Sequence, residues 1–459
     1  MKKIKISLFL LVLSTALYLL VLPPSLLSYR QSEVAALSII TIGMWATAIV
    51  PEYLTSLCFF LVSMLFSLAP ASVIFAGFAS SAVWLIFGGL VLGLAINSTG
   101  LGKRTAALVA RHLGGSYIKI IAGLVTAGVM FSFLMPSAMG RVVLLTPIAA
   151  ALSEQFGFVK GSNGRTGVIL AVIMGSFLPA FAVLPANVPN MVLSGMAESQ
   201  YHISLLYGPY LLLHFPVMGF LRALIMIFII VRLCPDTPAL TMHAKSEVCA
   251  NRLSFQEKIL ASVLVALLIL WGTDFIHHIS PAWVALSGAV FLLLPPVSIV
   301  TTKMFNQKMN WASIIFVAGI LGLGTLINHS GLGYRLAGAI IKFLPVGPGR
   351  EFVDYICVIL ASAATGVVTT LPGVPAVLTP FADTLAKATG FSVESVLMMQ
   401  VLGFATVIFP YQAPPIVVGM QLSEERFSVA LKFCLIMTVA TVLFLLPLDF
   451  LWWRIQGMI

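Results

Sequence analysis

A short segment that occurs twice constrains the fold of this chain more than any other feature. Residues 96–102 read INSTGLG and residues 327–333 read INHSGLG, with five of seven positions identical. The Leu-Thr-Pro at 145–147 returns at 378–380, so the order of the related segments is kept. Two related halves in an apolar chain are typical of transporters built from structural repeats, in which the binding site lies where broken helices of the two halves meet.

The composition places the chain in a membrane. Hydrophobic residues make up 60% of it and charged residues only 9%, whereas about 25% of the residues in a soluble domain are charged. A membrane-spanning helix needs about 20 apolar residues. The candidate spans are 6–24, 34–50, 53–69, 81–100, 166–184, 205–232, 257–273, 281–298, 311–330, 394–420 and 428–450. We therefore expect an all-α polytopic membrane protein with about 11 transmembrane helices.

The charges predict how the chain is oriented. Met1-Lys2-Lys3-Ile4-Lys5 precedes an apolar run without an A-x-A-like cleavage site, which favours an uncleaved first helix with a cytoplasmic N-terminus. Most basic loops then fall on the cytoplasmic side of an inner membrane, as the positive-inside rule requires. Five spans separate the two copies of the repeated segment. Because five is odd, the two halves have opposite orientations and the repeat is inverted.

Two further apolar stretches, 117–155 and 352–388, are interrupted halfway, which predicts one hairpin in each half. The expected organisation is an N-terminal helix (1–33), a first repeat (34–232) with its hairpin at 117–155 and a broken helix at 166–198, a cytoplasmic linker (233–256), and a second repeat (257–459) with its hairpin at 352–388 and a broken helix at 394–420.

Proline-rich sequences mark four helix breaks in matched order. They are the hairpin tips at 135–140 and 369–375 and the mid-span breaks at 184–190 and 409–415. Unpaired backbone is tolerated at membrane depth only where protein or a wet cavity meets it. N–H groups at a half-helix N-terminus favour an anion, and free carbonyls ligate a cation. Simple proline kinks are the alternative for any single site.

Arg141 is the most unusual single residue, because it follows the first break inside an apolar stretch. A charge at the bilayer centre costs about 2.5 to 3.5 kcal/mol on insertion scales, so it requires a partner. One hypothesis pairs its planar guanidinium with a substrate carboxylate or sulfate; the other pairs it with a protein group or with helix carbonyls. Asn187 and Gln412 occupy equivalent places in the two mid-span breaks, and as amides they serve an anion, a cation or only the broken backbone.

Several function classes have little support. The acidic residues considered, from Glu52 to Glu394, fall near span ends or hairpin mouths, which argues against a buried carboxylate for proton exchange. The seven histidines lack metal-ligand spacing, and we interpret them as solvated or interfacial. No P-loop, HExxH or GxSxG motif occurs, so neither an ATP-driven pump nor an enzyme is expected. The net charge of +10 suits an anionic membrane leaflet and does not require nucleic acid.

This layout resembles the divalent anion:sodium symporter family (DASS, INDY-like), within the group of ion transporters that includes citrate and arsenite permeases. The resemblance rests on the Gly-Leu-Gly-x-Arg segments, on a hairpin tip ten residues before Thr-Pro in each half, and on the Pro-Asn or Pro-Pro breaks. It implies a homodimer of elevator type, in which two re-entrant hairpins and the broken helices move against a scaffold. It also implies Na⁺ as the coupling ion, with no other cofactor.

The hairpin tips depart from the family pattern. Ser-Asn-Thr is typical there and holds a substrate carboxylate beside sodium. This chain has Ser137-Ala138-Met139 in the first tip and Thr370-Leu371-Pro372 in the second, so both asparagines are missing. The resemblance therefore implies the fold more firmly than the substrate.

The main hypothesis is a secondary transporter, not an enzyme, that carries a small di- or trivalent anion, with a di- or tricarboxylate and sodium coupling expected. Anion exchange or proton-coupled transport is the alternative, and an intramembrane enzyme or a subunit of a complex is a remote one. The predicted substrate site comprises Ser137, Arg141, Asn187, Pro189, Thr370, Gln412 and Pro414. The predicted cation site comprises Ser137, Ala138, Asn187, Thr370 and Gln412.

Overall fold

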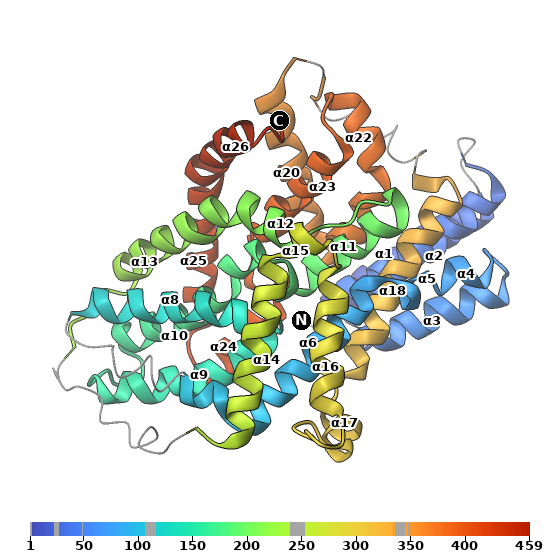
Figure 1. Cartoon of the computed structure of the whole chain (residues 1–459). Helices are drawn as coiled ribbons and strands as arrows, with labels where there is room; N and C mark the ends of the chain where they lie inside the picture. Colours follow the sequence, from blue (N-terminus) through green and yellow to red (C-terminus); the bar gives the residue numbers. More distant parts are fainter. Residues whose placement is uncertain are drawn as a thin grey trace.

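The computed structural model describes residues 2–22, 27–47, 49–105, 116–238, 253–333, 335, 345–347 and 349–459. Within these ranges the regular elements are all helical (Figure 1), which confirms the all-α prediction. Eight of the described helices are long and apolar enough to cross a membrane, or nine if one bent pair counts as a single span. Phe9–Val21, Glu52–Leu65 and Pro281–Leu293 are shorter apolar helices at three further predicted spans.

The first half contains helices of very different lengths. They are α1 (Lys2–Val21), α2 (Tyr29–Thr47), α3 (Glu52–Leu65), α4 (Ala71–Ile74), α5 (Ala76–Ala79), α6 (Ser81–Thr99), α8 (Tyr117–Leu134), α9 (Ala138–Gln155), α10 (Asn163–Phe177), η1 (Pro179–Ala182), η2 (Leu184–Ala186), α11 (Val188–Tyr201), α12 (Tyr207–His214), η3 (Phe215–Leu221) and α13 (Arg222–Leu233).

The second half has a similar succession. Its elements are α14 (Phe255–Gly272), α15 (Asp274–His277), α16 (Pro281–Leu293), α17 (Thr302–Lys308), α18 (Trp311–His329), α20 (Glu351–Thr369), α21 (Gly373–Leu378), η5 (Thr379–Phe381), α22 (Ala382–Thr389), α23 (Val393–Ala405), η6 (Pro410–Gln412), α24 (Pro414–Ser423), α25 (Phe427–Ala440), η7 (Thr441–Leu445) and α26 (Leu446–Ile455).

The hairpins and broken helices of the two halves pack against one another. The first hairpin is α8 and α9, and the second is α20 with α21, η5 and α22. In each half the chain then breaks between two half-helices, α10 and α11 or α23 and α24. The second half-helix crosses to the other half of the chain: α24 packs on α9 and α10, while α11 packs on α21 and α18. The two halves therefore share one core and are not separate bundles.

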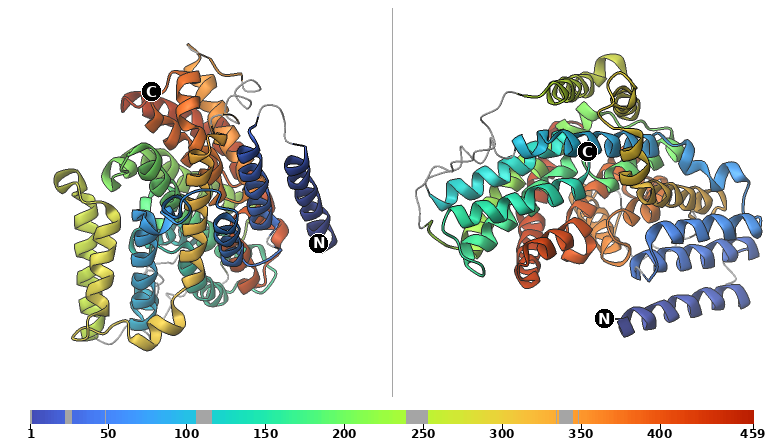
Figure 2. Two further views of the ribbon diagram at one scale, coloured as in Figure 1. Left: turned by 90° about the vertical axis from the view of Figure 1, so that its right-hand side faces the viewer. Right: turned by 90° about the horizontal axis from the view of Figure 1, so that it is seen from below.

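Other helices lie outside this shared core. Both views of Figure 2 show α1 at one edge of the molecule and α14 near the opposite edge. Helix α1 packs on α2, and α14 packs on α16, which in turn packs on α6. The most buried predicted span is Asn163–Ala182, whose apolar window is 100% buried inside the protein. Half-helix α10 is thus surrounded by protein on all sides and lies at the centre of the molecule.

The repeated segment has one structural role in both halves. It ends α6 and α18, where Gly100 and Gly331 adopt positive φ values of 79° and 71°. This left-handed conformation costs other residues roughly 1–2 kcal/mol, so glycine suits both positions. The next glycine, Gly102, would bring a Cβ atom within 2.7 Å of Leu144 in α9, and Gly333 would bring one within 3.2 Å of Pro380 in the second hairpin. The segment therefore ends a long helix and seats the chain against the hairpin of its own half.

Charged residues join the two halves at one end of the shared core. Lys160, in the loop after α9, forms an ion pair with Glu424 at the end of α24. Its hydrogen bond and charge lower the pKa of the Glu424 carboxyl below the ordinary value. Beside it, Arg165 forms ion pairs with Glu154 at 2.9 Å and Glu425 at 3.4 Å. The first hairpin, α10 and α24 are therefore tied together by charge as well as by apolar packing.

Most of the predicted linker at 233–256 lies outside the described residues, as do the amphipathic segments that follow the repeated glycines, apart from residues 103–105, 335 and 345–347.

Candidate functional site

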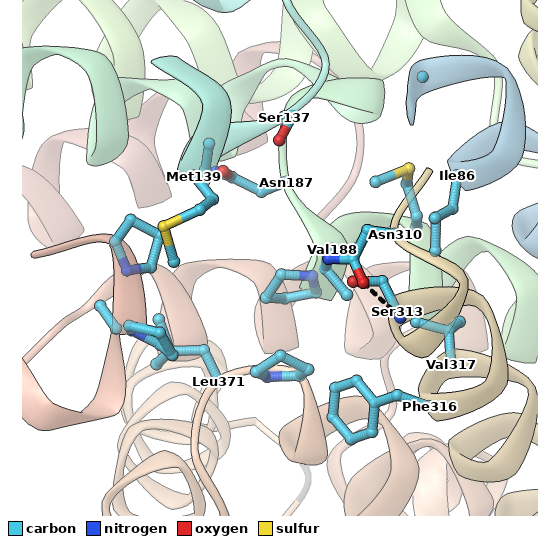
Figure 3. Close-up of a pocket in the computed structure, with 18 of the residues that line it drawn as sticks. Ile86, Ser137, Met139, Asn187, Val188, Asn310, Ser313, Phe316, Val317 and Leu371 are labelled. Atoms are coloured by element: carbon cyan, nitrogen blue, oxygen red, sulfur yellow. Dashed lines mark hydrogen bonds between the residues drawn. The ribbon is translucent and has the colours of Figure 1, made fainter. Parts of the chain in front are cut away.

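A cavity of about 300 Å³ lies where the two hairpin tips and the two mid-span breaks meet. Seven of the eight predicted site residues line it: Ser137, Ala138, Asn187, Pro189, Thr370, Gln412 and Pro414. They come from both halves of the chain, at 137–189 and 370–414, and converge because α11 and α24 each cross to the other half. Figure 3 shows Ser137, Met139 and Asn187 on one side of the cavity and residues of α18 on another.

Several helices begin at this cavity, and three of them, α9, α11 and α24, begin at the first hairpin tip and at the two mid-span breaks. Ser137, Asn187 and Ala413 are the N-cap residues of α9, α11 and α24, and all three line it. The N-terminus of an α-helix carries about half a positive charge and N–H groups without intrahelical acceptors. Convergence of such ends in an apolar wall produces a positive potential without any basic side chain, and the arrangement is suited to binding an anion.

The helix ends differ in the hydrogen bonds that they offer. Half-helix α24 begins with Pro414 and Pro415, and α11 carries Pro189 in its first turn. Proline lacks an N–H group but has the φ value of a first helical turn, so these ends contribute chiefly their electric field. Helix α9 begins with Ala138 and Met139, whose N–H groups belong to the unpaired first turn. The first hairpin tip is therefore the richer source of backbone donors.

Three side chains add further donors. The Ser137 hydroxyl oxygen accepts a hydrogen bond from Gly140 N at 3.1 Å, which leaves its proton free for a ligand. Gln412 Oε1 accepts from Phe409 N at 2.7 Å, while Gln412 Nε2 is buried without a partner among the described residues. Thr370 projects from the second tip with a φ value of 67° and a ψ value of 167°, a region that is nearly restricted to glycine. Such strain is typical of ligand-binding positions.

Asn187 is fully occupied by the break in which it lies. In the amide orientation that pairs both polar atoms, it donates to Ala186 O at 3.0 Å and accepts from Phe181 N at 3.2 Å. Neighbouring Asn190 donates to the carbonyls of Phe181 and Val183, each at 3.0 Å. These amides hold the unwound segment in one conformation, which is the backbone role considered for Asn187.

Arg141 is the one predicted site residue that does not line the cavity. Its side chain is 0% exposed, and the guanidinium donates to Ser176 O at 2.9 Å, Ala186 O at 3.1 Å and the carbonyl of Met135. The structure thus places it in the second of its two hypothesised roles, in which it satisfies carbonyls freed by the breaks. No ion pair of Arg141 occurs in the described part of the chain, so its charge lies behind the cavity wall without a carboxylate partner.

Sequence reasoning missed the other wall of the cavity. Asn310 and Ser313 begin α18, and Asn310 Oδ1 accepts from Ser313 N at 3.2 Å (Figure 3). Exposed Glu52, at the start of α3, is the only charged side chain among the described lining residues. The sequence around these residues contains no proline-rich helix break, so only the tertiary structure shows that they lie at the site.

One expectation about ionisable residues was wrong, and one buried carboxylate was overlooked. Asp449, near the end of the last predicted span, is 0% exposed. His214 is also 0% exposed and is neither solvated nor interfacial. Sequence reasoning could have found Asp449 and the equally buried Arg222, because each is a charged residue within a predicted span.

Comparison with known proteins gives one family and several relatives. A family model described as the sodium:sulfate symporter transmembrane region matches residues 2–459. A membrane protein of Cupriavidus necator is 25% identical over 362 residues, which cover 74% of this chain and 68% of that protein. The L-tartrate/succinate antiporter of Escherichia coli (strain K12) is 24% identical over 286 residues, which cover 59% of this chain and 58% of that protein.

Two solved structures share the fold. The YdaH transporter of Alcanivorax borkumensis has a TM-score of 0.55 and 16% identity, covering 86% of this chain and 89% of its own. MtrF of Neisseria gonorrhoeae, described among antimetabolite efflux pumps, has a TM-score of 0.56 and 14% identity, covering 96% of this chain and 97% of its own. At such identities the likeness shows the fold alone.

Proposed function

The chain belongs to the sodium:sulfate symporter family, and from this premise we propose that it is a secondary transporter of small dicarboxylates with the cavity as its substrate site. The observation that carries the proposal is the convergence of the N-terminal ends of α9, α11 and α24 on a cavity without basic side chains. In this environment the helix ends stabilise an anion. The name of the Escherichia coli relative, an L-tartrate/succinate antiporter, supports the dicarboxylate class.

Arg141 supports an anionic substrate indirectly. A buried charge without a partner costs several kcal/mol, and an anion in the adjacent cavity would offset part of this cost. The guanidinium need not touch the anion, since charges interact over longer distances in a medium of low dielectric constant. Arg141 would thus act as a fixed positive charge behind the site.

We propose that the two carboxylates of the substrate bind at the two hairpin tips. The N–H groups of Ala138 and Met139 with the Ser137 hydroxyl would receive one carboxylate. The Thr370 hydroxyl and Gln412 Nε2 would receive the other. Because charge-assisted hydrogen bonds are the stronger ones, this pairing favours divalent over monovalent substrates.

The coupling ion is a separate proposal. Family membership favours sodium, and a sodium site here requires neutral oxygens, since no cluster of three acidic, histidine or cysteine side chains occurs among the described residues. In the first half Arg141 occupies three carbonyls near the break and would repel a cation. The corresponding position in the second half, six residues before Pro380, is Val374. We therefore propose that sodium, if coupled, binds beside Thr370 and not beside Ser137.

Exchange without sodium is the second candidate. The positive charge of Arg141 disfavours a cation at the first-half part of the predicted cation site, and the Escherichia coli relative is named an antiporter. Elevator-type movement of the shared core and a homodimeric assembly are further proposals. They are supported by the way in which hairpins and broken helices pack as one unit across the two halves.

Thermal unfolding of the purified protein tests the substrate proposal. Succinate, tartrate, citrate, sulfate and arsenite are compared in sodium or choline buffer. A ligand at 100 times its Kd stabilises the native state by about 2.7 kcal/mol. Stabilisation by succinate or tartrate in sodium alone supports symport, and equal stabilisation in choline supports exchange. No stabilisation by either dicarboxylate contradicts the proposed substrate class.

A further inference from the structure

A second group of buried polar side chains lies away from the cavity, where α12, α13, α20 and α26 meet. It comprises His214, Arg222, Tyr355, Asp449 and Trp453, each no more than 1% exposed. Tyr355 Oη donates to Asp449 Oδ2 at 3.0 Å. The Trp453 ring lies 5.8 Å from that of His214 and 5.7 Å from that of Tyr355, between centroids. We name these five residues the buried polar cluster.

Several polar atoms of the cluster have no hydrogen-bond partner among the described residues. They are Asp449 Oδ1, both ring nitrogens of His214, Arg222 Nε and Trp453 Nε1. Each such atom costs roughly 1–3 kcal/mol when buried, and isolated examples are rare in folded proteins. Five in one place indicate a site whose polar groups are used by something other than the fold. Ionisable residues inside apolar spans indicate function for the same reason.

Arg222 connects this cluster to both mid-span breaks. Its Nη2 donates to Ala405 O at 3.0 Å, and its Nη1 donates to Leu178 O at 3.4 Å. Ala405 is the last residue of α23, and Leu178 directly follows α10. One guanidinium thus holds the carbonyl ends of the first half-helices of both repeats. A cation is favoured at these negative ends of the helix dipoles.

The surrounding helices are distorted in a matched way. The chain is π-helical at η3, between His214 and Arg222, and again at η7, four residues before Asp449. Prolines at 216 and 447 remove hydrogen-bond donors at these places. The two π-helical segments also contact each other. Such segments are rare and are often found at functional sites.

The ionisable groups that face Asp449 can be named from each packed element. Tyr355 from α20 donates to Asp449, and the charge of Arg222, at the junction of η3 and α13, acts on it. From α12, His214 contacts the Trp453 ring of α26, and the Tyr210 hydroxyl donates to Phe181 O at 2.9 Å. Neighbouring Asp354 instead accepts from Gly347 N at 3.2 Å. Asp449 and Arg222 form no ion pair within the described residues, so the aspartate is not locked to the arginine.

We propose that Asp449 is a proton-binding site whose protonation state is communicated through Arg222 to both helix breaks. When the carboxylate takes up a proton from water, it becomes a neutral carboxylic acid and no longer balances the Arg222 charge. The potential at the breaks then becomes more positive, which strengthens binding of an anion at the cavity. This last step rests on the proposed function, and by linkage a bound anion must raise the proton affinity of Asp449 by the same factor.

On this proposal the proton would enter from a second cavity of about 190 Å³, which is lined by Tyr210, Glu394 and Gln456 among other residues. The Tyr210 ring lies against His214, with centroids 4.5 Å apart and ring planes inclined by 59°. His214 has both nitrogens available to pass a proton between this cavity and the cluster.

Infrared difference spectra of the full-length protein in liposomes, recorded across about pH 5 to 9, test the proton site without any substrate. The carboxylic-acid C=O band of a buried aspartic acid should grow as the pH falls. It should vanish in Asp449→Asn and remain in Asp383→Asn, a matched control in α22 whose side chain is 46% exposed. Tyr355→Phe should keep the band but move its midpoint to higher pH, because the variant removes a donor to the ionised form. A band that persists in Asp449→Asn, or a midpoint unchanged in Tyr355→Phe, overturns the proposal.

The link to the breaks is tested by repeating the titration with saturating succinate. We expect the Asp449 midpoint to move to higher pH, and we expect Arg222→Gln to abolish that movement. If succinate stabilises the protein thermally but leaves the Asp449 midpoint unchanged, communication through Arg222 is refuted. If succinate does not stabilise the protein at all, it is the proposed substrate that fails, and the substrate-free titration still decides the proton site.

Discussion

At the scale of single residues, the arginine in the first hairpin shows how a charge within an apolar span can serve the backbone. Arg141 is wholly buried and donates to three main-chain carbonyls near the breaks. The planar guanidinium, with five donors, is suited to this role in a way that lysine is not. In the proposed function its charge acts on the cavity through its electric field, and Ser137, Thr370 and Gln412 line the cavity itself.

The role of Arg141 predicts a loss of stability that is independent of ligand. We expect Arg141→Met to remove a donor from three buried carbonyls, of which Ala186 O keeps the Asn187 amide and Ser176 O keeps the Ser132 hydroxyl. The Met135 carbonyl loses its Arg141 donor, and we expect a destabilisation of at least roughly 1–3 kcal/mol. Thermal unfolding without substrate measures the loss, with Lys119→Met on the exposed side of α8 as the control. A variant as stable as the wild type without substrate, but no longer stabilised by succinate, would contradict the structural role and favour direct contact.

Gln412 offers a nearly isosteric test of the anion site. In Gln412→Glu the carboxylate can still accept from Phe409 N, but the unpaired amide donor becomes an anionic oxygen. We expect succinate affinity to fall at least tenfold, which corresponds to about 1.4 kcal/mol. Isothermal titration of the purified protein measures this change. The control is Gln421→Glu, which makes the same substitution at an exposed position near the other end of α24; equal losses in the two variants would count against the site.

At the scale of elements, a glycine ends one long helix in each half. Gly100 and Gly331 adopt the left-handed conformation, and the glycine two residues later lies close to the hairpin of the same half. The duplicated sequence therefore preserves a helix end and a close approach. This explains why these glycines persist in both copies while the polar residues at the hairpin tips differ.

Alanine substitutions of two glycines, one at the end of α6 and one within it, should change the stability of the protein in opposite directions. A Cβ atom at Gly100 would meet no neighbour within 4 Å, so Gly100→Ala tests conformation alone. We expect it to destabilise the protein by roughly 1–2 kcal/mol. Gly93 is helical and also has open space, so Gly93→Ala should stabilise by about 0.5–1 kcal/mol. Thermal unfolding of both variants measures these changes in stability. A stabilising effect of Gly100→Ala would mean that the end of α6 can adopt another backbone conformation without cost.

At the scale of the whole molecule, the cavity reaches one side of the protein. Glu52 at the start of α3 and Asn310 at the start of α18 line it, and the predicted topology places both on the cytoplasmic side. The corresponding residues of the opposite side are absent from its described lining. We therefore expect this conformation to be open to the cytoplasm in an alternating-access cycle.

Labelling of single cysteines tests the direction of this opening. In a cysteine-free background, Ser313→Cys should react with a membrane-impermeant maleimide only from the cytoplasmic side, and succinate should protect it. Ile279→Cys, in the exposed loop between α15 and α16, should react only from outside and without protection. Reaction of both variants from the same side would overturn the predicted topology.

Much of the architecture was determined by the sequence itself. Apolar runs of helical length predicted the all-α membrane fold, since a polar backbone in lipid must satisfy its own hydrogen bonds. Prolines located the breaks, because proline lacks the N–H group that a helix interior requires. The paired breaks also identified Ser137, Thr370 and Gln412 as lining residues, since both repeats interrupt their helices at the same site.

Only the tertiary structure decided which polar groups face the cavity and which serve the protein. Arg141 turned towards carbonyls that lie far from it in sequence, and Asn187 closed on its own break. Asn310 joined the site from a helix without any break, and Asp449 met Tyr355 from a span 94 residues away. Local sequence predicts where a backbone must be interrupted. The partner that satisfies a buried polar group depends on which distant segments pack beside it, and the crossing of α11 and α24 between the halves determines that.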